Sequence, residues 1–177
     1  MASLTAHFSA MARNNRWSNH VLLRAVCALQ PGEFEAERTS FFPSIAETLN
    51  HNLAIDRYYL DALAQGGIGP AAFHAFKPCG EPQALADAQR AQDEALMVFC
   101  DRLEESDLDR SVITDRGRNG QIPERIDNLL AHLFQHQIHH RGQVHAMLAG
   151  TSVKPPQLDE FFLDYDRDPE IARMGLL

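Results

Sequence analysis

Hydrophobic residues recur at three- and four-residue intervals in four long segments of the chain, and glycine and proline residues separate these segments. Such spacing places the apolar side chains on one face of an α-helix. The predicted helices run from about Leu4 to Leu29, from near Pro43 to Leu63, from about Gln83 to Leu103, and from Pro123 or Glu124 to Gly150. We therefore expect an all-α protein, most economically a four-helix bundle.

Two segments outside these helices carry other patterns. In "RSVITDRGRNGQIPE", short β-prone stretches flank Asn119 and Gly120, which predicts a small β-hairpin between the third and fourth helices. After Gly150, "QLDEFFLDYD" indicates a short amphipathic turn or helix on the surface, and the residues from about Asp166 have little with which to pack. We expect one domain over residues 1–177, with a core of about 1–150 and a tail of 151–177.

The charge balance narrows the classes of partner. The chain has 16 Lys and Arg against 24 Asp and Glu, which gives a formal net charge of −8. This charge opposes binding to phosphate backbones and to anionic membrane surfaces, so we expect neither a nucleic acid nor a membrane partner. The sequence also lacks a long apolar run and a secretory signal, which predicts a cytoplasmic protein. The cysteines are widely spaced and odd in number, and they indicate neither disulfides nor a thiolate zinc site.

The segment "HLFQHQIHHRGQVHAML", residues 132–148, concentrates the histidines of the chain. With His136 at zero on a helical wheel of about 100° per residue, His140 falls at about 40°, so both are predicted to lie in the middle of an apolar stripe. His132, His139 and His145 fall at its edge or on the far side. Two imidazoles one turn apart can reach a single metal ion. The alternative is that both are core histidines hydrogen-bonded to carbonyls or carboxylates.

A third ligand has to come from another helix, and His51 in "SIAETLNHNLAIDRYYLDAL" is the best candidate, because its helix face carries small and mixed residues. Three histidines leave a coordination position open, which is typical of catalytic ions. His51 alone would instead be interpreted as a capped or surface histidine. The zinc-protease motif does not apply, because Gln137 stands where that motif needs a glutamate base.

Beyond these patterns, the sequence resembles the DinB/YfiT-like metalloenzyme superfamily, the DinB family of damage-inducible proteins. The resemblance covers nearly the whole chain and is carried by "NNRWSN", "SFFPSIAETLNHNLAIDRYYL", "HLFQHQIHHRGQVHAML" and "PPQLDEFFLDYD". It implies a four-helix bundle with a long crossover, a homodimer, and a metal site formed by His51, His136 and His140. The implied cofactor is a divalent ion, namely nickel, zinc or manganese, among which imidazole ligands do not choose.

The resemblance and the open coordination position together predict a metal-dependent enzyme acting on a small-molecule substrate. It would be a hydrolase or a transferase that uses a low-molecular-weight thiol, and the catalytic group would be water or a thiolate held by the ion. The alternative is a non-catalytic metal-binding protein of the stress response, in which the ion is structural. A third hypothesis is a dimeric interaction module that binds no metal.

Residues other than the three histidines are predicted to support the site, to anchor packing or to form a salt bridge. Asn15, Tyr58 and His139 are the candidates for contacts that support the metal ligands, and for Asn15 a polar cap on the bundle surface is an equal alternative. Trp17 is expected to anchor packing. Arg141 lies at the far edge of the predicted stripe, which favours a surface salt bridge over a carboxylate partner at the dimer or tail.

Overall fold

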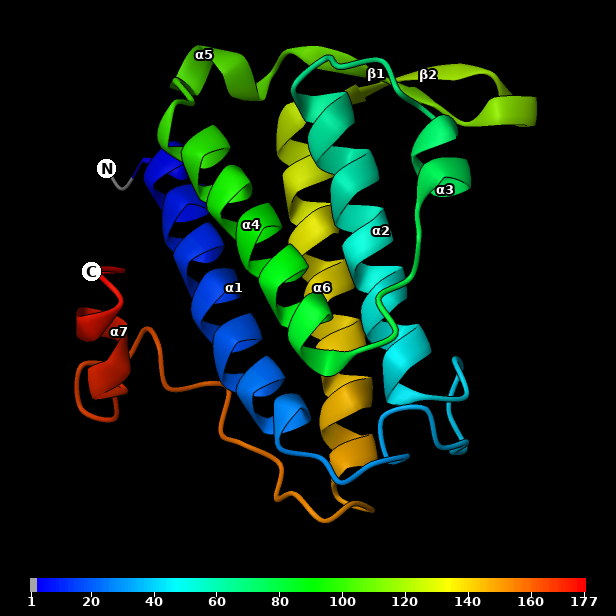
Figure 1. Cartoon of the computed structure of the whole chain (residues 1–177). Coiled ribbons are helices and arrows are strands. Elements are labelled where there is room, and N and C mark those ends of the chain that lie inside the picture. Colours follow the sequence, from blue (N-terminus) through cyan, green and yellow to red (C-terminus); the bar gives the residue numbers. More distant parts are fainter. Residues whose placement is uncertain (1–2) are drawn as a thin grey trace.

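The computed structural model describes residues 3–177 and is mostly helical, with a small two-stranded antiparallel sheet. Four long helices lie side by side (Figure 1): α1 (Leu4–Cys27), α2 (Ile45–Leu63), α4 (Pro82–Asp101) and α6 (Ile126–Leu148). The short helices are α3 (Ala71–Ala75), α5 (Glu105–Leu108) and α7 (Pro169–Arg173). The predicted helical class is confirmed, although α3 and α5 were not anticipated from the sequence. No helix within residues 3–177 is long and apolar enough to cross a membrane.

Side-chain caps fix where the first two long helices begin. Ser3 Oγ accepts from the backbone N–H of Ala6 at the start of α1, and Ser44 Oγ accepts from that of Glu47 at the start of α2. Each bond satisfies a backbone donor that has no partner within its own helix. The cap at Ser44 explains why α2 begins at Ile45, just after Pro43, rather than at the proline.

The predicted hairpin is confirmed. Strands β1 (Ser111–Asp115) and β2 (Gln121–Arg125) pair in antiparallel fashion, with Ile113 opposite Pro123. Because β2 extends to Arg125, the prediction that the fourth helix begins at Pro123 or Glu124 is wrong by two to three residues. The hairpin lies across one end of the long helices (Figure 1).

The first two long helices, α1 and α2, do not pack against each other. Helix α1 packs mainly against α4 and also against α6, whereas α2 packs mainly against α6 and also against α4. Helices α1 and α2 are therefore at opposite corners, and residues 28–44 cross the end of the bundle to join them (Figure 1). This arrangement places α2 directly beside α6.

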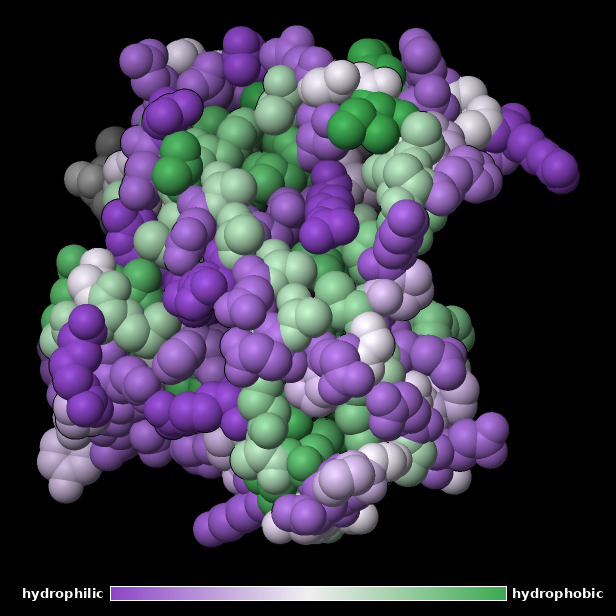
Figure 2. Space-filling view, in the orientation of Figure 1, coloured by the Kyte–Doolittle hydropathy of each residue, from purple (hydrophilic) through white to green (hydrophobic). Residues whose placement is uncertain are grey.

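The interior has two apolar clusters with a polar layer between them. One cluster lies toward the hairpin and includes Tyr59, Leu96 and Leu130, and the other lies toward the 28–44 crossover and includes Leu22 and Leu148. Between the two clusters every long helix contributes buried polar side chains. On the outside, hydrophilic residues cover most of the face in Figure 2, with hydrophobic patches between them, notably at the end near the hairpin.

The expectation that the chain end has little to pack is wrong. Ile171 and Leu176 are 0% and 4% exposed, and they form a third cluster with Trp17 and Phe161. The indole Nε1 of Trp17 donates to Asp168 at 3.1 Å, immediately before α7. Trp17 is thus the packing anchor that the sequence predicted, and the tail is what it anchors.

Candidate metal centre

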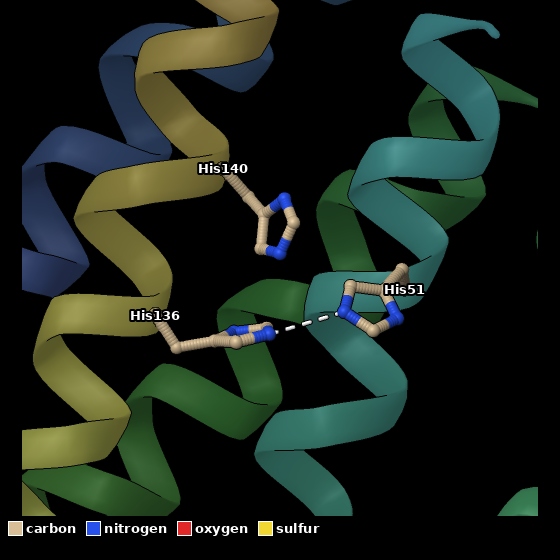
Figure 3. A group of neighbouring side chains, drawn as sticks. All are labelled: His51, His136 and His140. Atoms are coloured by element: carbon tan, nitrogen blue, oxygen red, sulfur yellow. Dashed lines mark hydrogen bonds between the residues drawn. The ribbon is translucent and has the colours of Figure 1, made fainter. Parts of the chain in front are cut away.

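Three histidines converge between α2 and α6 (Figure 3). His51 comes from α2, and His136 and His140 come from successive turns of α6. One ligand atom of each lies within 4.8 Å of the other two. The Nε2 atoms of His51 and His136 are 3.0 Å apart, and the ring centroids of His51 and His140 are 4.8 Å apart. The structure therefore brings together the three residues that the sequence nominated as ligands.

The spacing of these nitrogen atoms fits a single ion. Two nitrogens at about 2.0–2.1 Å from a tetrahedral zinc ion lie about 3.3–3.4 Å apart by simple trigonometry. The separation of 3.0 Å between Nε2 of His51 and Nε2 of His136 is close to that value. Two neutral imidazoles facing each other share only one proton, whereas a cation accepts a lone pair from each ring. The donor set is consistent with a divalent metal ion.

Burial keeps all three imidazoles neutral. Removal from water, together with the nearby histidines, lowers the pKa of His136 to about 3 and that of His51 to about 4. Burial also lowers the pKa of His140. Neutral rings offer lone pairs near pH 7, so no proton has to leave before a metal binds.

The positions of the two α6 histidines differ from the wheel prediction in phase. The buried face of α6 extends from near His140 past Arg141 to Phe134, at about 160° from His136 on the same wheel. His136 therefore lies at the edge of the buried face, where α2 meets α6, rather than in its middle. At this edge His136 is half-buried and faces α2, the helix that carries His51.

Other side chains orient or cover the cluster. Nδ1 of His140 hydrogen-bonds Oε1 of Gln143 at 2.7 Å, which leaves Nε2 of His140 free to bind a metal ion. Phe42, from the crossover, places its ring centroid 4.5 Å from that of His51 and 5.7 Å from that of His140. Nδ1 of His136 is buried and has no hydrogen-bond partner within residues 3–177.

The remaining histidines of α6 lie outside the three-histidine cluster, as the helical wheel predicts. His132 and His139 are exposed on the rim of the cluster. Nε2 of His139 lies 3.2 Å from Nε2 of Gln143, so its contact with the metal site runs through the residue that orients His140. His145 faces the tail, where its Nε2 is 2.9 Å from the carbonyl oxygen of Pro156.

Tyr58 does not belong to the cluster. Its hydroxyl donates to the backbone carbonyl of Asp115 at 2.6 Å, and its ring stacks on Phe73. The expectation that Tyr58 supports a metal ligand is therefore wrong, because its position on α2 directs it toward the hairpin. Tyr58 instead fastens the hairpin to the bundle.

The expected surface salt bridge of Arg141 is also wrong. Arg141 is 5% exposed, and its guanidinium donates to Oδ1 of Asn15 and, at 3.1 Å, to Oδ1 of Asn19. Asn15 is likewise buried and donates to Asp93 rather than to any histidine. The segment "NNRWSN" thus supplies hydrogen-bond partners to the interior of the bundle.

Arg141 is part of a buried polar belt to which each long helix contributes two residues one turn apart. Its members are Asn15 and Asn19 of α1, Asn52 and Asp56 of α2, Gln89 and Asp93 of α4, and Gln137 and Arg141 of α6. Gln89 Nε2 donates to Asp56 at 2.8 Å and to Asp93 at 3.0 Å, which joins the two carboxyl groups. The repeated i, i+4 spacing of polar pairs was a readable signal that the sequence interpretation did not use.

The belt holds two carboxyl groups and one guanidinium away from solvent. Burial raises the pKa of Asp56 to about 6 and that of Asp93 to about 7, while hydrogen bonds and Arg141 oppose the rise. Burial lowers the pKa of Arg141 to about 10, so it remains protonated at pH 7. The guanidinium of Arg141 therefore keeps its positive charge in the interior. The negative charge on Asp56 and Asp93 that balances it increases as the pH rises.

Comparison with known proteins extends these observations. A sequence model of the DinB family matches residues 1–170. Among solved structures, a DinB-like protein from Bacillus subtilis is similar, with a TM-score of 0.60 and 16% identity, over 86% of this chain and 97% of that chain. At this identity the similarity shows the fold alone. No curated protein sequence matches the chain.

Proposed function

The chain belongs to the DinB family, and on that basis we propose that it binds one divalent metal ion through His51, His136 and His140. The protein uses this ion as a metal-dependent enzyme on a small-molecule substrate, as a hydrolase or as a transferase of a low-molecular-weight thiol. The observation that supports the proposal is the convergence of three neutral imidazoles from two helices. The packing of α1 and α2 against α4 and α6 also supports the DinB helix order with a long crossover.

The side chains of the site have separate tasks in this function. Burial holds His51 and His136 in their neutral form, and Gln143 fixes the ring of His140. When bound, the ion supplies Lewis-acid chemistry, which favours the anionic form of water or of a thiol near neutral pH. No hydrogen bond joins the three rings to a carboxylate within the part of the chain that the structure describes. This composition favours the thiol branch, in which the nucleophile needs no protein base.

The position of Phe42 favours a second candidate function, in which the ion is structural. The Phe42 ring lies against both His51 and His140 and covers part of the cluster with an apolar surface. A site closed in this way would tie α2 to α6 in a non-catalytic, metal-binding protein of the stress response. The two candidates differ in whether the fold depends on the metal.

Metal content of the protein purified without an affinity tag tests the proposal. We expect about one divalent ion per chain in the parent after growth with supplemented metals, and a large loss in His140→Ala. His145→Ala is the matched control, because His145 is on the same helix but bonds the tail. A parent that holds no divalent metal would contradict both candidates.

Removal of the metal by a chelator then separates the candidates. A retained helical circular dichroism spectrum with a cooperative melting transition favours a catalytic ion, whereas loss of the fold favours a structural one. A screen of small electrophiles, with and without added thiols, distinguishes the hydrolase from the transferase. Turnover that requires the thiol supports the transferase.

A further inference from the structure

The polar belt and the histidine cluster share backbone positions. His136 and His140 of α6 directly precede the belt residues Gln137 and Arg141. On α2, His51 directly precedes the belt residue Asn52. Any contact that fixes Gln137 relative to Asn52 therefore also fixes the neighbouring metal ligands relative to one another.

Such a contact is present. Nδ2 of Asn52 donates to Oε1 of Gln137 at 3.2 Å, and Nε2 of Gln137 donates to Oδ2 of Asp56. The single amide of Gln137 thus bonds two residues that lie one turn apart on α2. All three side chains are at most 2% exposed, so water does not compete for these bonds.

These two bonds define the axial register of α2 and α6, meaning the offset of one helix along the other. A slip of one residue moves a helix by about 1.5 Å and turns its side chains by about 100°. That slip would break both bonds and leave buried polar atoms without partners, which is strongly unfavourable. Apolar contacts in the flanking clusters tolerate repacking more readily. A buried polar pair is accordingly an effective device for fixing register.

We propose that Gln137, through Asn52 and Asp56, is a positioning residue of the metal site: it fixes the register of α6 against α2 so that His136 and His140 meet His51. The inference rests on the proposed metal site. Arg141 extends the same role toward α1 by its bonds to Asn15 and Asn19. The metal ligands would then be arranged by the belt before any ion binds.

Titration with Co²⁺ alone, followed by its visible absorption and by competition with a chelator, tests the proposal. We expect Gln137→Leu and Asn52→Ala to weaken Co²⁺ binding by about 10- to 100-fold, as loss of an outer contact to metal ligands does elsewhere. Asn50→Ala is the matched control. Asn50 also adjoins His51 and is buried, but its side chain bonds Ala46 and Cys79 rather than α6.

A charge-conserving exchange tests whether the hydrogen bonds themselves matter. In Asp56→Asn combined with Gln137→Glu, the carboxylate moves to α6 and accepts from amides at positions 52 and 56. We expect this double variant to recover Co²⁺ affinity to within about threefold of the parent, because the bonds between the helices are restored. The single variant Gln137→Glu places two carboxyl groups together, so we expect its Co²⁺ affinity to stay below that of the double variant.

Helix register is also measurable without metal. Spin labels at exposed Arg57 and Gln135, in a Cys27→Ser and Cys79→Ser background, report the distance between α2 and α6. We expect a broader or shifted distance distribution in Gln137→Leu and the parent distribution in Asn50→Ala. An unchanged distribution in Gln137→Leu would overturn the register role even if no metal binds.

The outcomes separate this inference from the proposed function. If the parent itself binds no Co²⁺, the metal site is wrong, and the spin labels alone decide the register role. If the parent binds Co²⁺ and Gln137→Leu binds it equally well, only the positioning role is overturned. The same conclusion follows if Asn50→Ala loses as much affinity as Asn52→Ala. Should Gln137→Leu fail to fold, the comparison of Asn52→Ala with Asn50→Ala carries the test.

Discussion

The Nε2 atoms of His51 and His136 lie 3.0 Å apart, although the two residues belong to different helices and are separated by 85 positions in the sequence. If both rings are neutral, one of these two nitrogens can donate a single proton to the lone pair of the other. A cation bound by both rings, and by His140 beside them, uses the lone pairs fully.

Removal of the ligand on α2 should abolish tight metal binding. We expect His51→Ala to weaken Co²⁺ affinity by more than about 100-fold, beyond the loss typical of an outer-contact variant. His132→Ala is the control, because His132 is exposed and its ring lies against Tyr59. Equal affinities of the two variants in a chelator competition would argue against His51 as a ligand.

Removal of the cover should change the rate of metal exchange more than the affinity. Phe42 contacts two of the three histidine rings but offers no ligand atom. We therefore expect Phe42→Ala to release Co²⁺ to a chelator several-fold faster, in a stopped-flow measurement. Phe41→Ala is the control, since Phe41 is 79% exposed. Identical release rates in the two variants would mean that Phe42 does not limit access.

The buried charges of the belt should be coupled. At pH 8, we expect Arg141→Met to lower the free energy of unfolding by about 3 kcal/mol, because it leaves buried carboxylate charge uncompensated. Adding Asp93→Asn to Arg141→Met should recover part of that loss. Urea unfolding of the parent, both single variants and the double variant measures the coupling. Strictly additive effects would show that Arg141 and Asp93 do not interact.

Asp93 should make stability depend on pH in a defined direction. Burial raises its pKa from 3.8 to about 7, so between these pH values the folded protein retains a proton that the unfolded chain has lost. Its contribution to the free energy of unfolding is therefore fully present below about pH 4 and lost as the pH rises to about 7.

The variant Asp93→Asn lacks this contribution. We expect the free energy of unfolding of Asp93→Asn, minus that of the parent, to increase between about pH 4 and pH 7 by a few kcal/mol. Asp56, Gln89, Asn19 and Arg141 surround Asp93 and remain in both proteins. Urea unfolding at successive pH values gives the difference, and a constant difference would contradict the raised pKa of Asp93.

The chain end should contribute to stability. Ile171 is 0% exposed and belongs to the cluster around Trp17, so we expect Ile171→Ala to cost about 2–4 kcal/mol. Leu177→Ala, at a position that is 71% exposed, should change little. Trp17 is the single tryptophan of the chain, and its emission should shift to the red only in Ile171→Ala. An unshifted emission would indicate that the tail does not cover Trp17.

Much of the secondary structure and of the candidate site was readable from the sequence. The start of α1 and the end of α2 match the predicted positions, and the hairpin formed around the predicted turn residues. His136 and His140 are one turn apart on one helix, so their proximity is a local property of the α-helix. His51 was selected from the small and mixed residues on its helix face, and the resemblance to the DinB family implied the same residue.

The errors share a physical cause. The predicted apolar stripe of α6 was centred on His136 and His140, which placed Arg141 outside it. The buried face also includes Leu130, Phe134 and Leu148. A guanidinium is expensive to bury alone, and its burial here depends on Asn15 and Asn19 of α1. Tyr58 was misassigned for a similar reason, because its partner is a backbone carbonyl of the hairpin.

The sequence by itself determined what repeats within a few residues: the helices, the hairpin turn, the paired histidines and the polar pairs one turn apart. The tertiary structure decided which of these pairs face one another, because a buried polar group is stable only when another element supplies its partner. Asn52 and Gln137 are 85 positions apart and meet only because α2 packs beside α6. That packing brings His51 to His136 and His140, whereas packing of the tail against α1 brings Ile171 to Trp17. No local pattern in the chain encodes these contacts.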